Sequence, residues 1–121
     1  MTRHLLLIVE DSDLNRDLLV QIFEDAYEIE TAADGKSAVE ATTRRKPDLI
    51  LMDIGLPGLS GLDAVREIRS RGDETPIVAV SSLVMPGDKE QALEAGCDAF
   101  VAKPIDDLRL VALVGRMIGD R

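Results

Sequence analysis

Acidic, hydroxyl and basic residues stand directly after short apolar runs in this sequence, and their types are suited to phosphoryl chemistry. The residues concerned are Glu10, Asp11, Asp53, Ser81 and Lys103. Side chains just past the carboxyl ends of parallel strands gather in one crevice, so we expect these residues to be neighbours. Three carboxylates facing one ammonium indicate a site for a divalent metal and a phosphoryl group.

Asp53 is the central candidate, because a carboxylate is a competent nucleophile toward phosphorus when a metal withdraws charge from the attacked group. Glu10 and Asp11 would repel Asp53 unless a cation lay among them. Mg²⁺, or Mn²⁺, removes this difficulty, since it prefers oxygen ligands in octahedral geometry. The alternative for each acid is an exposed loop residue without a function.

Lys103 and Ser81 are candidate ligands of the phosphoryl group. The Lys103 ammonium can neutralise an added phosphoryl charge, and we expect it to pair with Asp53 before that. The Ser81 hydroxyl can donate a hydrogen bond to a phosphoryl oxygen. Pro104 restricts the backbone at Lys103, where the strand ends. This restriction favours a functional lysine over an ordinary surface lysine.

Short apolar runs alternate with helical patterns along the chain, which is typical of a parallel sheet wrapped by helices on both faces. We expect an α/β fold with a doubly wound, five-stranded parallel sheet and five helices. The expected strands are 5–9, 27–32, 49–52, 76–80 and 99–102. The expected helices are 13–25, 36–45, one that starts near 58–61, 86–95 and 106–118.

Two of these helices allow finer predictions. Asp13 is expected to cap the helix 13–25. The last helix is apolar around most of its circumference, with Leu108 and Ile118 on one arc and Leu110 and Val114 on the other. One arc can pack on the sheet, which leaves the other for a partner or for loosely covered surface.

Length and composition exclude several classes of protein. The 121 residues fit a single domain over 1–121, with no room for an output domain. The formal charge of −9 opposes direct binding to nucleic acid and to anionic membranes. A lone Cys97, short apolar runs and no signal segment favour a cytoplasmic protein without membrane insertion.

The sequence resembles the receiver domain of two-component response regulators over essentially its whole length. The motifs that carry the resemblance are VEDS (9–12), LMDIGLPGLSG (51–61), VSS (80–82) and AFVAKPI (99–105). The resemblance implies a flavodoxin-like fold with strand order 2-1-3-4-5. Phosphorelay receivers and the receivers of hybrid sensor kinases are the most similar groups.

The resemblance also implies a role for each matching residue. Asp53 is the expected phosphoacceptor. The expected magnesium ligands are Glu10, Asp11, Asp53 and the carbonyl of Gly55. The expected phosphoryl-binding and switch residues are Ser81, Ser82, Lys103 and Phe100, although Ser82 stands where the family commonly has alanine.

The partners implied by the resemblance are proteins. The phosphoryl donor is a histidine kinase or a histidine phosphotransfer domain, docking on Leu14, Pro104 and Ile105. A downstream protein target senses the phosphorylated state on a surface within residues 86–116. A stand-alone regulator fits this length, and a phosphorylation-dependent homodimer is compatible with it.

Three alternatives remain open from the sequence. The first is a receiver that acts as a scaffold without being phosphorylated. The second is an aspartyl-phosphate phosphatase. Such an enzyme requires a second acidic residue two positions after its nucleophile, where this chain has Gly55. The third is a flavin-binding protein, whose first loop must bind a phosphate group that Glu10 and Asp11 would repel. In the main interpretation the protein is not an enzyme, apart from catalysing its own phosphorylation and dephosphorylation.

Overall fold

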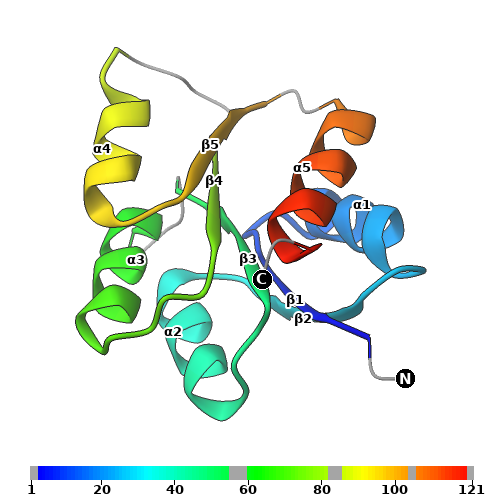
Figure 1. Cartoon of the computed structure of the whole chain (residues 1–121), viewed down its shortest axis with the longest axis horizontal. Helices are drawn as coiled ribbons and strands as arrows, with labels where there is room; N and C mark the ends of the chain where they lie inside the picture. The colour runs from blue at the N-terminus through cyan, green and yellow to red at the C-terminus, as the bar shows by residue number, and fades with distance from the viewer. Residues whose placement is uncertain (1–2, 55–59, 82–85, 104–105, 120–121) are drawn as a thin grey trace.

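The computed structural model describes residues 3–54, 60–81, 86–103 and 106–119. A five-stranded, all-parallel sheet with the strand order β2-β1-β3-β4-β5 forms its centre (Figure 1). The strands are β1 (Leu5–Val9), β2 (Glu28–Ala32), β3 (Leu49–Asp53), β4 (Ile77–Ser81) and β5 (Ala99–Ala102). The expected fold class and strand order are therefore confirmed.

Helices cover both faces of the sheet, as a doubly wound fold requires (Figure 1). The helices α2 (Gly35–Arg44), α3 (Gly61–Ser70) and α4 (Asp88–Ala95) lie on one face. The helices α1 (Asp13–Phe23) and α5 (Asp107–Gly119) lie on the other. Within the described part of the chain, none of the helices combines the length and apolar character that a membrane span requires.

Two strands extend one residue further than the apolar runs suggest. Asp53 is the last residue of β3 and is paired in register with Val80 of β4. Ser81 is the last residue of β4 and is paired with Ala102 of β5. The backbone of both polar residues is thus held by strand pairing at the edge of the sheet where the strands end.

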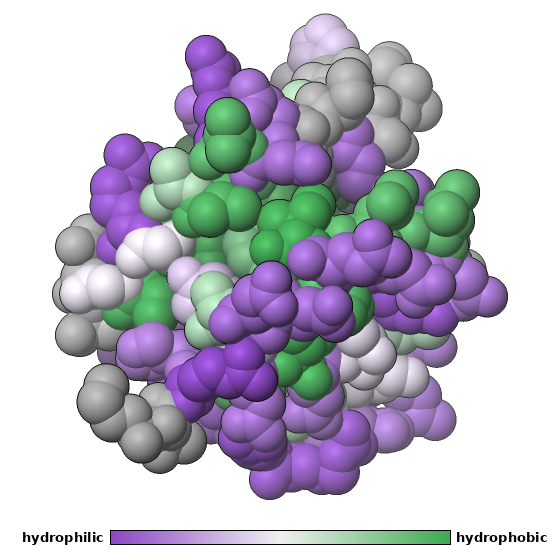
Figure 2. All heavy atoms as spheres, turned by 90° about the vertical axis from the view of Figure 1, so that its right-hand side faces the viewer, coloured by the Kyte–Doolittle hydropathy of each residue, from purple (hydrophilic) through white to green (hydrophobic). Residues whose placement is uncertain are grey.

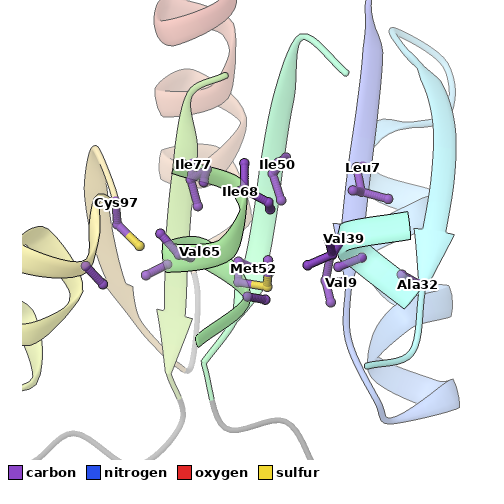
Figure 3. Close-up of a cluster of buried hydrophobic side chains, with 14 of the residues drawn as sticks. Leu7, Val9, Ala32, Val39, Ile50, Met52, Val65, Ile68, Ile77 and Cys97 are labelled. Atoms are coloured by element: carbon purple, nitrogen blue, oxygen red, sulfur yellow. The ribbon is translucent and has the colours of Figure 1, made fainter. Parts of the chain in front are cut away.

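The apolar side chains form two separate clusters, one on each face of the sheet. In the first cluster, side chains of β1 and β3 such as Val9 and Met52 meet Val39 of α2 and Val65 of α3 (Figure 3). β1 is buried along its whole length, because α2 and α3 cover one face and α1 and α5 the other. β2 is half-buried at the sheet margin, as its alternating sequence indicates.

The predicted cap of α1 is wrong by one residue. The N-cap is Ser12, whose hydroxyl accepts a hydrogen bond of 3.3 Å from the backbone N–H of Asn15. Asp13 is the first helical residue, and its carboxylate pairs with Arg16 one turn later. A cap must have an extended backbone, and Ser12 has it with φ −80° and ψ 121°.

The prediction for the last helix is corrected in detail. Leu110, Val114 and Ile118 are all buried, because a spacing of four residues places them on one stripe facing the sheet. Ile118 therefore belongs with the core and not with Leu108, which is 82% exposed. Val111, 40% exposed, lies on the uncovered side with Leu108.

Gly61 allows α3 to begin directly against the end of β3. A Cβ atom at this position would lie 2.4 Å from the carbonyl oxygen of Asp53 and 2.5 Å from the Cα atom of Ile54. Both neighbours are backbone atoms that cannot rotate away. The absence of a side chain at Gly61 therefore helps to fix the backbone that carries Asp53.

We predict that Gly61→Ala lowers the free energy of unfolding by about 1–3 kcal/mol, because the strand and the helix must separate. Gly115→Ala is a matched control in the interior of α5, where the nearest atom, the Tyr27 hydroxyl oxygen, lies 3.8 Å from the new Cβ. It should be neutral or stabilising by about 0.5–1 kcal/mol. Urea unfolding followed by circular dichroism measures both values, and equal effects would contradict the close approach.

Burial also controls the chemistry of the single cysteine. Cys97 is 5% exposed, and burial raises the pKa of its thiol to about 11. Since the thiolate is the reactive form, the native protein should resist iodoacetamide at pH 8 and react rapidly in urea. Mass spectrometry over time measures the two rates, and equal rates would show that the thiol is accessible.

Candidate functional site

Three carboxylates converge at the edge where β1 and β3 end. Glu10 and Asp11 directly follow β1, and Asp53 ends β3, the neighbouring strand. One carboxylate oxygen of each lies within 4.8 Å of the others. Glu10 is buried, Asp53 is half-buried and Asp11 is exposed, so the group opens toward solvent on the Asp11 side.

Glu10 is the most constrained of the three acids, with only 2% of its surface exposed. Its backbone N–H donates to the carbonyl oxygen of Ala32 at 3.0 Å, which extends the β1–β2 pairing by one residue. Its carboxylate accepts hydrogen bonds from the ammonium of Lys103 at 2.6 Å and from the backbone N–H of Ser12 at 3.3 Å. A buried carboxylate needs such partners to offset its loss of water.

Lys103 lies between two of the carboxylates. Its Nζ is 2.6 Å from Oε1 of Glu10 and 3.7 Å from Oδ2 of Asp53. The sequence led us to expect a pair with Asp53, and the shorter contact is with Glu10. The backbone N–H of Lys103 donates to the carbonyl oxygen of Ser81 at 2.7 Å, which fixes the lysine relative to β4.

Arg16 is a residue of the site that the sequence reasoning missed. Its guanidinium donates from Nη1 to the backbone carbonyl oxygen of Glu10 at 3.0 Å and pairs through Nη2 with the carboxylate of Asp13. The spacing of three residues on a helix signals the pair with Asp13. No pattern in the sequence signals the contact with the Glu10 carbonyl, which depends on the turn before α1.

The remaining predicted residues divide into described and undescribed ones. Ser81 ends β4 at the same edge and is 7% exposed. Phe100 lies in β5, half-buried against the core cluster on the α2, α3 and α4 side of the sheet. Four further predicted residues lie outside the described residues: Gly55, Ser82, Pro104 and Ile105.

A hollow of about 280 Å³ adjoins the site between α1 and α5. It is lined by Glu10, Asn15, Leu18, Leu19, Ile22, Lys103 and Asp107. Leu14 and Leu18 on the same side of α1 are 69% and 48% exposed. Figure 2 shows this side of the molecule, where apolar surface interrupts the polar surface.

The donor set fits a hard divalent cation. Each of the three acids offers one carboxylate oxygen. Mg²⁺ and Mn²⁺ prefer such oxygen ligands over nitrogen or sulfur. The ammonium of Lys103 lies beside Glu10 and Asp53 and supplies one positive charge. Three carboxylates outweigh this charge, so a divalent cation would offset the negative charge that remains.

The fold and the site define the class of protein. The family model of the response regulator receiver domain matches residues 6–115, and the chain belongs to this family. Receiver domains are signalling modules of two-component systems, and they bind Mg²⁺ in an acidic pocket. The polar-differentiation response regulator DivK of Brucella anthropi is 35% identical over 117 residues, which cover 94% of this chain and 95% of DivK.

Solved structures agree with this assignment. The receiver domain of the sensor histidine kinase PA1611 from Pseudomonas aeruginosa PAO1, with magnesium in its active-site cleft, is 36% identical with a TM-score of 0.89. The alignment covers 98% of this chain and 99% of that one. The signal receiver domain of a LuxO repressor protein from Vibrio parahaemolyticus is 28% identical, with a TM-score of 0.91, and 98% and 92% of the two chains are covered.

We predict that Lys103→Met lowers the free energy of unfolding in EDTA by about 1–3 kcal/mol, because buried Glu10 loses its charged partner. Saturating Mg²⁺ should raise the melting temperature of this variant more than that of the wild type, since the cation replaces the missing charge. Thermal and urea unfolding with and without Mg²⁺ measure both effects.

Lys46→Met is the control for this substitution. Lys46 is 59% exposed and lies 3.9 Å from Asp73, far from the converging acids, so its loss should change little. If Lys103→Met were as stable as this control, Glu10 would not depend on Lys103.

Proposed function

We propose that this receiver accepts a phosphoryl group on Asp53 from a histidine kinase or a histidine phosphotransfer protein. The observation that carries the proposal is the convergence of Glu10, Asp11 and Asp53, with the ammonium of Lys103 beside Glu10 and Asp53. Such a set can hold a divalent cation and, beside it, an anion that needs charge neutralisation.

In the proposed reaction, an Oδ atom of Asp53 attacks phosphorus and forms the new O–P bond. The N–P bond of the donor phosphohistidine breaks, and its electron pair returns to the imidazole, which takes up a proton. Bound Mg²⁺ would supply charge neutralisation on the phosphoryl oxygens. Glu10, Asp11 and Asp53 would hold the ion, together with the Gly55 carbonyl, which lies outside the described residues.

Lys103 and Ser81 are proposed to bind the transferred group. Lys103 sits 3.7 Å from Asp53 and need only shift from Glu10 to contact a phosphoryl oxygen. Ser81 is the last residue of β4, the strand adjacent to β3, at the same edge of the sheet. Ser82, which follows it, is proposed as a further contact. Phosphorylation adds about −1.5 to −2 charges, which gives both side chains a reason to move.

The proposed output is a changed surface formed by α4, β5 and α5. A hollow of about 630 Å³ lies along β5 and α5, with Phe100, Arg109 and Leu113 among its lining residues. Phe100 is half-buried and is paired with Ala79, two residues before Ser81 in β4, so we propose that a movement of Ser81 changes its packing. A downstream protein target would sense this change. The net charge of −9 opposes direct binding of nucleic acid to this surface.

The donor is proposed to dock beside α1. Leu14 is 69% exposed, and Leu18 lines the hollow that reaches Lys103, so apolar surface leads directly to the phosphorylation site. Pro104 and Ile105 follow Lys103 in sequence and are proposed to extend this contact. We propose that the regulator acts in the cytoplasm, where the lone Cys97 stays reduced.

Incubation with acetyl phosphate and Mg²⁺, followed by intact mass spectrometry, tests the proposal. The wild type should gain one phosphoryl group, and Asp53→Asn should gain none. Asp63→Asn is a matched control, because it removes the same charge from the first turn of α3, where Asp63 pairs with Arg66. It should be labelled like the wild type.

EDTA should abolish the labelling of the wild type, since the converging acids would then lack their cation. An unlabelled wild type would contradict the proposal and favour the alternative, a receiver that serves as a scaffold without phosphorylation.

A further inference from the structure

Arg16 connects the first turn of α1 to the turn that carries the acidic residues. Nη1 donates to the carbonyl oxygen of Glu10 at 3.0 Å, while Nη2 pairs with Asp13 on the helix itself. The Arg16 side chain is 21% exposed, whereas that of Asp13 is 88% exposed. The bond to the Glu10 carbonyl is part-buried and is therefore less weakened by water than the exposed pair with Asp13.

We propose that Arg16 is a positioning residue for the divalent cation site, acting through the backbone between Glu10 and Asp11. This inference rests on the proposed magnesium site. The carbonyl group of Glu10 shares one rigid peptide plane with the N–H and Cα atoms of Asp11. Holding that carbonyl oxygen therefore orients the Cα atoms of both acidic residues, and with them the directions of two of the three carboxylates.

Arg16 holds the peptide plane between Glu10 and Asp11, and other contacts hold the groups on either side of it. The N–H of Glu10 is fixed by Ala32, and its carboxylate is fixed by Lys103 and Ser12. The Ala32 and Lys103 contacts act on Glu10 itself, whereas the Ser12 N–H belongs to the peptide plane that follows Asp11. Asp11 is exposed and belongs to no helix or strand, and Arg16 holds the peptide plane that precedes it.

Charge and geometry predict opposite effects for the loss of Arg16. As a positive charge near three carboxylates, Arg16 repels a divalent cation, so its removal should tighten cation binding by Coulomb's law. As a positioning residue, it keeps the acids in a cation-binding arrangement, so its removal should weaken binding. Loss of such an outer contact typically costs about tenfold or more in metal affinity.

Isothermal titration calorimetry with MgCl₂ on the full chain separates the two effects. We expect the dissociation constant for Mg²⁺ to rise about tenfold in Arg16→Gln. Arg16→Lys keeps the charge but loses the two-pronged contact, so it should also weaken binding, by a smaller factor. Thermal unfolding in EDTA, recorded beside each titration, reports stability independently of the metal.

Arg66→Gln is the matched control. Arg66 pairs with Asp63 in the first turn of α3 at the same spacing of three residues as Arg16 and Asp13, but its side chain is 56% exposed and pairs within α3. Both Gln variants lose one helical ion pair. Only the Arg16 variant should lose Mg²⁺ affinity, whereas the affinity of Arg66→Gln should equal that of the wild type.

If folded Arg16→Gln binds Mg²⁺ as tightly as the wild type, or more tightly, the inference is overturned and the proposed function still stands. If Arg16→Gln does not fold, Arg16→Lys decides: unchanged affinity overturns the inference, and weaker binding supports it. A wild type that binds no Mg²⁺ would overturn the proposed site itself, and the inference with it.

Discussion

A carboxylate removed from water must be compensated, and in this protein the ammonium of Lys103 compensates Glu10. Glu10 follows β1 and Lys103 follows β5, two strands that are separated in the sheet by β3 and β4. The ion pair therefore reaches across the edge at which Asp53 and Ser81 end their strands. Asp53, at the end of β3, lies 3.7 Å from the same lysine, so one ammonium connects two of the three acids of the site.

Much of this arrangement could be predicted from residues alone. Apolar runs of four or five residues located the strands, because side chains covered on both faces leave a continuous apolar signal. The strand order came from the resemblance, since periodicity does not specify which strands are neighbours. The cap of α1 was placed on Asp13 and not on Ser12, because both residue types cap helices equally well and only the backbone distinguishes them.

Contacts that depend on a turn were beyond the reach of sequence reasoning. The bond from Arg16 to the Glu10 carbonyl and the closer approach of Lys103 to Glu10 than to Asp53 depend on the path of the backbone at the strand ends. The same holds for Gly61, whose role is visible only when the path of α3 against β3 is known. Residue type indicated which chemistry was present, and backbone geometry decided which groups meet.

The hydrogen bond from the Lys103 N–H to the Ser81 carbonyl joins two strand ends through main-chain atoms alone. Side-chain replacement at either position leaves that bond available, so Ser81→Ala would delete a hydroxyl without uncoupling β4 from β5. The chemical and mechanical contributions of this serine can thus be separated genetically. The coupling between these two strand ends therefore does not depend on which side chains stand at positions 81 and 103.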